Sequence, residues 1–92
     1  MKVYVVRWTR RSNGEEDGGN FGECYTDRTH ANFAMQEEFN FMVRDWQKDY
    51  AGWKMETCNE DGYCSILIHN DEFSCMEWFV DELEVIESVK TA

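Results

Sequence analysis

Proline is missing from the 92 residues, and no apolar stretch approaches the length needed to cross a membrane. The absence of proline removes one common sign of an interdomain linker. The N-terminal stretch MKVYVVRWTRR lacks the long apolar core and the small-residue cleavage site of a secretory signal. We therefore expect a soluble, cytoplasmic protein with a single domain over residues 1–92, because this length supports one two-layer core.

Motifs for catalysis are also missing, among them GxGxxG, the P-loop, HExxH and GxSxG. Nothing in the pattern places His30 beside a particular cysteine, so a cysteine nucleophile with an oriented base is not indicated. Four possible zinc ligands fall within eighteen residues but form no close pair of the kind that structural zinc sites use: Cys58, Cys64, His69 and Cys75. The sequence predicts a non-enzymatic protein without a cofactor or metal.

Lysine and arginine are absent between Met55 and Val89, although the chain up to Lys54 contains eight of them beside nine acidic residues. The segment without basic residues carries ten acidic ones: Glu56, Glu60, Asp61, Asp71, Glu72, Glu77, Asp81, Glu82, Glu84 and Glu87. Such an acidic block repels the phosphates of nucleic acid and of anionic membranes. It instead favours a partner with a basic surface, and the net charge of −10 agrees with this.

The stretch Asp27 to Tyr50 has the spacing of one long amphipathic helix. Its apolar residues recur at intervals of three and four and gather on one side: Ala31, Ala34, Met35, Phe39, Met42, Val43, Trp46 and Tyr50. Thr26 or Asp27 can cap its first turn, and Gly52 can end it. This helix is the element on which the rest of the chain is expected to pack.

Strand signals flank the helix. Lys2 to Thr9 is rich in β-branched and aromatic residues and predicts a strand inside a sheet. The following tract, about residues 10–20, predicts a flexible loop because charged and turn residues surround three glycines. Phe21 to Tyr25 is compatible with a short strand.

A hairpin is indicated after the helix, because Asp61-Gly62 suits a tight turn between Trp53–Cys58 and Tyr63–His69. The pairing that best separates apolar from polar faces places Met55 opposite Ile68 and Thr57 opposite Ile66. In this register Cys58 and Cys64 lie on opposite faces and cannot form a disulfide.

A second helix is expected from about Glu72 to Glu82, capped by Asn70 or Asp71. The segment Glu84 to Val89 suits either an extension of this helix or a last strand. If it is a strand, the order is β-α-β-β-α-β, and we predict this ferredoxin-like α+β fold, an antiparallel sheet with two helices on one face. The alternative is an α+β domain with an N-terminal hairpin and a longer final helix.

The expected second helix also supplies the candidate binding site. A tryptophan and several carboxylates fall on its outer side, the composition of many protein–protein hot spots: Asp71, Glu72, Glu77, Trp78, Asp81 and Glu82. The alternative interpretation is a solvated acidic face that keeps the protein soluble, with Trp78 packed against a loop.

In its size, its aromatic content and its acidic block from Glu56 to Glu87, the chain resembles small acidic proteins that phages encode against bacterial defence. These include anti-CRISPR proteins and DNA mimics. The resemblance implies a protein that occupies a basic surface of a nucleic-acid-handling enzyme, such as a CRISPR effector, in the host cytoplasm and inhibits it. The rival hypothesis is a small homo-oligomeric assembly module that pairs through a sheet face bearing Cys58, Leu67 and His69.

Overall fold

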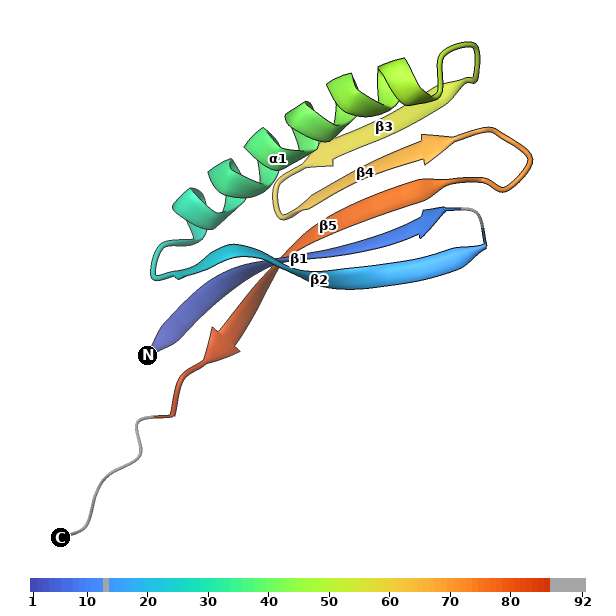
Figure 1. The fold of residues 1–92 in the computed structure, drawn as a ribbon. Helices are drawn as coiled ribbons and strands as arrows, with labels where there is room; N and C mark the ends of the chain where they lie inside the picture. Colours follow the sequence, from blue (N-terminus) through green and yellow to red (C-terminus); the bar gives the residue numbers. More distant parts are fainter. Residues whose placement is uncertain (13, 87–92) are drawn as a thin grey trace, which may run out of the picture.

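The computed structural model describes residues 1–12 and 14–86 of the chain. Within these residues the element order is β1 (Lys2–Ser12), β2 (Glu15–Tyr25), α1 (Arg28–Asp49), β3 (Met55–Glu60), β4 (Tyr63–Ile68) and β5 (Cys75–Glu84). The strands form one antiparallel sheet in the order β2-β1-β5-β4-β3, and α1 packs across one face of it (Figure 1). The predicted ferredoxin-like fold is therefore wrong, because the described chain has the order ββαβββ with a single helix.

The N-terminal hairpin replaces the predicted flexible loop at about residues 10–20. β1 continues to Ser12, and β2 returns beside it with Arg10 opposite Asp17 and Arg11 opposite Glu16. Opposite charges in directly facing positions stabilise an antiparallel pair. The prediction is wrong because charged residues and glycines are typical of loops, whereas here the charges match across two paired strands. The strand expected at Phe21–Tyr25 is confirmed as the end of β2.

The long helix is confirmed almost to the residue. Asp27 is its N-cap and accepts a hydrogen bond from the backbone N–H of Thr29 at 2.8 Å, and Tyr50 is its C-cap. The helix buries the predicted apolar side against the sheet, with Ala31, Met35, Phe39 and Trp46 as its buried residues.

The hairpin β3–β4 has the predicted register, with Met55 opposite Ile68 and Thr57 opposite Ile66. Gly62 adopts a φ of 79° in its turn, a conformation that few other residues adopt without strain. Its backbone N–H donates to the side-chain oxygen of Asn32 at 2.8 Å, which ties the turn to the start of α1. All four cysteines are free.

The predicted second helix is wrong, because Cys75 to Glu84 forms β5 in the middle of the sheet. The apolar residues of this segment fit both periods, since Met76, Trp78 and Val80 also alternate as in a strand. Pairing with β1 on one side and β4 on the other decides for the strand. Of the segment Glu84–Val89, Glu84 ends β5, and positions 87–89 lie outside the described residues. The alternative fold was therefore right about the N-terminal hairpin and wrong about its final helix.

The two faces of the sheet have different surroundings. On the face beneath α1, Val6, Cys64, Ile66, Ile68 and Trp78 are buried in one cluster with the helix side chains. No described element covers the opposite face, which we call the open face. Along β5, Met76, Trp78 and Val80 lie on the helix side, and Cys75, Glu77, Phe79 and Asp81 lie on the open face.

Candidate functional site

Trp78, the predicted anchor of the binding site, is completely buried. Its ring packs edge-on against Phe39 of α1, with 5.7 Å between the ring centres. A strand turns alternate residues to opposite faces, so Trp78 enters the core while its neighbours Glu77 and Phe79 lie on the other side. The prediction that Trp78 is an exposed anchor is therefore wrong.

The carboxylates of the predicted site do not form one surface. Glu77 and Asp81 lie on the open face, and Glu82 lies on the helix side of the sheet beside Tyr4, whose hydroxyl donates to it at 3.3 Å. Asp71 and Glu72 are exposed in the connection between β4 and β5. The predicted site depends on a helical period that this segment does not have.

The acidic block of the sequence meets basic groups from the N-terminal part of the chain. β5 lies beside β1, so the Arg7 guanidinium reaches Asp81 at 2.7 Å. Five of the ten acidic residues lie within salt-bridge distance of a cation, in the pairs Arg7–Asp81, Arg28–Asp61, Lys54–Glu56, Lys2–Glu82 and the N-terminal amine with Glu84. Each pair is exposed and contributes little to stability. Together they reduce the negative field that the sequence block alone would suggest.

The aromatic residues of the open face are partly covered by their neighbours. The guanidinium of Arg7 lies 4.6 Å from the centre of the Phe79 ring, and the ring of Tyr63 lies 5.2 Å from it on the other side. The Tyr63 hydroxyl donates to the Glu77 carboxylate at 2.6 Å. Burial and then this hydrogen bond raise the pKa of Tyr63. In these contacts the charged groups of the open face interact with other residues of the same face.

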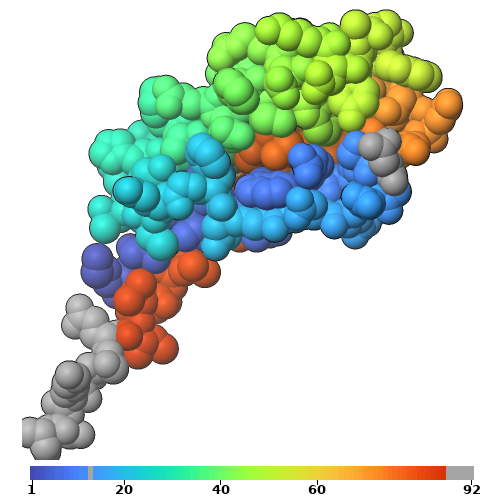
Figure 2. Space-filling model, in the orientation of Figure 1, coloured from blue at the N-terminus to red at the C-terminus, as the bar shows by residue number. Residues whose placement is uncertain are grey.

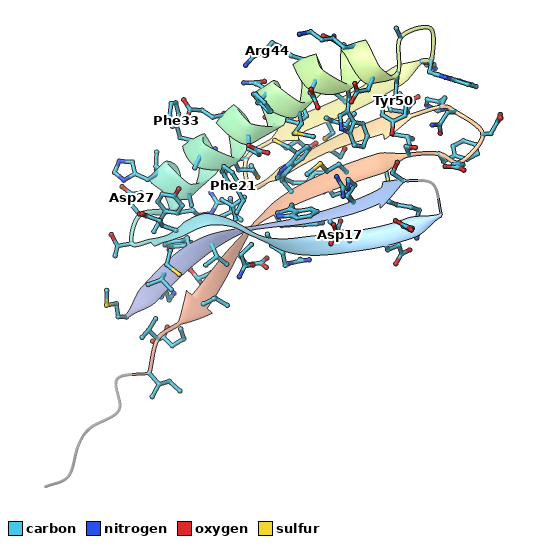
Figure 3. All side chains as sticks on the ribbon, in the orientation of Figure 1. Asp17, Phe21, Asp27, Phe33, Arg44 and Tyr50 are labelled. Atoms are coloured by element: carbon cyan, nitrogen blue, oxygen red, sulfur yellow. The ribbon has the colours of Figure 1, made fainter. Side chains whose placement is uncertain are left out.

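A second surface has unpaired charge. A groove of about 430 Å³ lies between the C-terminal half of α1 and the end of the β1–β2 hairpin. We call it the acidic groove and define it by its lining residues: Arg10, Ser12, Glu15, Glu16, Asp17, Met42, Asp45, Trp46, Asp49 and Tyr50. In Figure 2, the helix (green) and the hairpin (blue) lie on opposite sides of a depression. Asp17 and Tyr50, labelled in Figure 3, come from these two sides.

The lining of the acidic groove is strongly negative, with five acidic residues and one arginine. Arg10 pairs with Asp17 at 3.2 Å, and Glu16 pairs with Arg11. Among the described residues, no cation lies within salt-bridge distance of Glu15, Asp45 or Asp49.

Aromatic side chains form one wall of the groove. The rings of Trp46 and Tyr50 lie 5.2 Å apart, and the Tyr50 hydroxyl is 3.2 Å from the hydroxyl of Ser12, which joins the helix end to the hairpin. Aromatic faces and carboxylates together attract guanidinium and ammonium groups. The groove is therefore suited to a basic side chain.

The sequence contained part of this site. Asp45 and Asp49 are spaced four residues apart on the predicted helix, next to Trp46 and Tyr50 in the chain. What sequence reasoning missed was the hairpin that forms the opposite side, since residues 10–20 were expected to be a flexible loop.

The chain matches no protein-family model, and no curated protein or solved structure is significantly similar to it. Among residues 1–12 and 14–86, no three His, Cys, Asp or Glu side chains are grouped to hold a metal ion. In the same ranges, no helix is both long and apolar enough to span a bilayer.

Proposed function

We propose that this protein is a non-enzymatic acidic binding protein whose acidic groove holds a basic segment of a nucleic-acid-handling enzyme and thereby inhibits it. The observation that supports the proposal is the groove itself, in which three carboxylates without a described cation lie beside two aromatic rings. The proposal keeps the partner class expected from the resemblance to anti-CRISPR and DNA-mimic proteins. It moves the binding site from β5 to the helix–hairpin groove.

The negative charge of the protein supports this proposal. The chain has a net charge of −10, so basic partners are attracted over the range of the ionic atmosphere. Long-range attraction speeds the encounter with a partner but does not fix the position in which the partner binds. The unpaired Glu15, Asp45 and Asp49 concentrate negative charge at one place, which gives an incoming arginine or lysine a defined position.

The shape of the groove also supports the proposal. Tyr50 is half-buried and its ring lies against the buried ring of Trp46, so Tyr50 presents a fixed surface that loses little entropy on binding. The volume of about 430 Å³ is within the range of roughly 300–1,000 Å³ typical of sites that enclose a small molecule. One long basic side chain can therefore enter the groove while the surrounding basic surface meets the rim.

The direct test compares two variants of equal net charge. Asp45→Lys with Asp49→Lys reverses two groove charges, and Asp71→Lys with Glu72→Lys makes the same change in the exposed β4–β5 connection. Each pair changes the net charge by four units, from −10 to −6. The groove variant is not expected to unfold, because both positions are exposed and lysine is favourable near a helix C-terminus.

Each protein is used as bait in nuclease-treated bacterial lysate, and the captured enzyme is then assayed for nucleic-acid cleavage or binding with added protein. We expect the parent and the Asp71, Glu72 variant to capture and inhibit the same enzyme, and the groove variant to lose at least about tenfold in affinity. Equal capture by both variants would show that the groove is not the site. Loss of capture only in the Asp71, Glu72 variant would instead place the contact in the β4–β5 connection.

The assembly-module hypothesis makes a different prediction. It requires the open face, with Cys58, Leu67 and His69, to pair with a second copy, and sedimentation would then show a dimer whose fraction rises with concentration. The binding-protein proposal predicts a monomer at the same concentrations. The Arg7 guanidinium lies over the Phe79 ring and places a charged group at the centre of that face. This arrangement favours the monomer.

A further inference from the structure

The C-terminal end of β5 has a free edge. β4 begins at Tyr63, which is opposite Phe79, and the last bond between these strands runs from the Val80 N–H to the Gly62 carbonyl at 3.0 Å. β5 then continues to Glu84 beside β1 alone. No described strand lies on its other side, and Figure 1 shows this end of β5 extending past β4.

The hydrogen bonds identify which backbone groups are free. The N–H of Val80 points toward β4, and the N–H of Val85 points toward β1, where it donates to the Met1 carbonyl at 2.8 Å. In an antiparallel sheet these directions alternate along the strand. The N–H and C=O groups of Glu82 and Glu84 therefore point to the free edge, where an added strand could pair with them.

The side chains beside this edge define the chemistry of a partner. Leu83 is 47% exposed on the open face, and the residues after the strand, Val85 and Ile86, are exposed as well. Glu82 and Glu84 lie on the other side of the sheet. They contact the Tyr4 hydroxyl, Lys2 and the N-terminal amine, but each carboxylate is more than half exposed and exchanges these partners at small cost.

We propose that this edge binds an extended segment of a partner protein as an added antiparallel strand in which two basic residues flank an apolar one. The apolar residue would lie opposite Leu83, and the basic residues opposite Glu82 and Glu84. Backbone hydrogen bonds would give affinity, and the alternation of charge and apolar contact would give specificity. This inference is independent of the acidic groove, which lies at the other end of the hairpin.

A second copy of the chain is a poor occupant of the same edge. If two β5 ends paired about Leu83, Glu82 of one copy would lie opposite Glu84 of the other, and the same clash would occur twice. Like charges in directly opposite positions are destabilising. The acidic side chains therefore protect the edge against self-association and select a basic strand.

The probe for this site is a blocked peptide with the sequence Thr-Lys-Val-Lys-Thr. Its binding is followed by backbone amide shifts of isotope-labelled protein, which separate contacts at residues 81–85 from contacts at residues 42–50 in the groove. The critical comparison uses two methylated forms. One carries N-methyl groups on both lysines, whose N–H groups would face β5, and the other carries one on the valine, whose N–H would face away.

We expect shifts at Glu82, Leu83 and Glu84, and at least about a tenfold loss of affinity for the lysine-methylated peptide, because two backbone hydrogen bonds are lost. The valine-methylated peptide should bind like the parent peptide. Equal binding of both methylated forms would mean a contact by charge alone and would overturn the proposal.

The protein variant Glu82→Lys with Glu84→Lys should abolish the shifts, and the equally charged Asp71→Lys, Glu72→Lys variant should retain them. Shifts confined to residues 42–50 would contradict the edge proposal while supporting the groove. If the Asp45, Asp49 groove variant captures the enzyme like the parent and the peptide shifts at the edge are intact, the groove proposal is contradicted and the edge proposal is supported.

Discussion

The two faces of the sheet both carry aromatic and acidic residues, but these residues have different surroundings on each face. Trp78 and Phe79 are neighbours in β5, yet Trp78 is fully buried under α1 and Phe79 lies on the open face beneath the guanidinium of Arg7. On the open face, Asp81 pairs with Arg7, and Glu77 accepts the Tyr63 hydroxyl. On the helix side, the acidic groove contains carboxylates without a described cation.

This difference shows that neighbouring charges, rather than the number of acidic residues, decide where a surface can bind. The most acidic segment of the sequence runs along β5 and around it, but β1 brings cations beside it. The less conspicuous acids of α1 and β2 remain available because their elements meet at the groove. Each of the following predictions tests this contrast.

The largest expected difference is between truncations at the two neighbouring aromatic positions. Trp78→Ala should lower the free energy of unfolding by about 3–5 kcal/mol, because it leaves a cavity beside Phe39. Phe79→Ala should cost about 1 kcal/mol, since it removes a partly buried ring and its contacts with Tyr63 and Arg7. Urea denaturation measures both values. Similar costs at the two positions would contradict the assignment of the faces.

The buried thiol on the helix side should make stability depend on pH. Burial raises the pKa of Cys64 from 9.0 to about 11, so the unfolded chain releases this proton at lower pH than the folded chain. The contribution is fully present below pH 9 and is lost as the pH rises toward 11. Two pKa units correspond to about 2–3 kcal/mol.

The matched control for this effect is Cys64→Ala, which is less stable at neutral pH but lacks the titrating thiol. The parent should therefore lose more stability than the variant between pH 8.5 and 10.5, as chemical denaturation at each pH would show. Parallel profiles would mean that Cys64 is more exposed to water than the structure indicates. Cys58, on the open face, provides a comparison at a less buried thiol.

A smaller effect is expected at the ion pair of the open face. A double-mutant cycle with Arg7→Ala and Asp81→Ala should give a coupling energy of at most about 1 kcal/mol, because both side chains are partly exposed. The coupling should fall as the salt concentration rises. A larger coupling that is insensitive to salt would show that this face is shielded from solvent, as in a dimer.

The smallest expected effect is a gain in stability when charge is removed from the groove. Asp45→Asn with Asp49→Asn relieves repulsion among carboxylates and favours the helix C-terminus, so stability at low salt should rise by about 0.5 kcal/mol or less. Asp81→Asn on the open face should instead be destabilising. Thermal unfolding at low and high salt compares them, and a loss of stability in the groove variant would indicate that its carboxylates have stabilising partners.

Local sequence patterns were sufficient to predict the elements whose defining contacts lie within a short segment of the chain. The α1 helix follows from apolar spacing and a cap at Asp27, and the β3–β4 register follows from the turn at Gly62 and the alternation around it. Both depend on interactions between residues near each other in the chain. The two carboxylates on the helix side of the groove could be identified for the same reason.

Tertiary structure decided what these patterns left ambiguous. Residues 75–84 fit a helix and a strand equally well, and only pairing with β1 and β4, from distant parts of the chain, selects the strand. That choice buries Trp78 and places cations beside the acidic block. The pairing of β1 with β2 forms the hairpin side of the groove, where composition predicted a loop. The sequence by itself determined the amphipathic helix, the central hairpin and the excess of negative charge. The acidic groove depends on contacts between distant segments, because these contacts decide which carboxylates are paired with a cation and which are left without one.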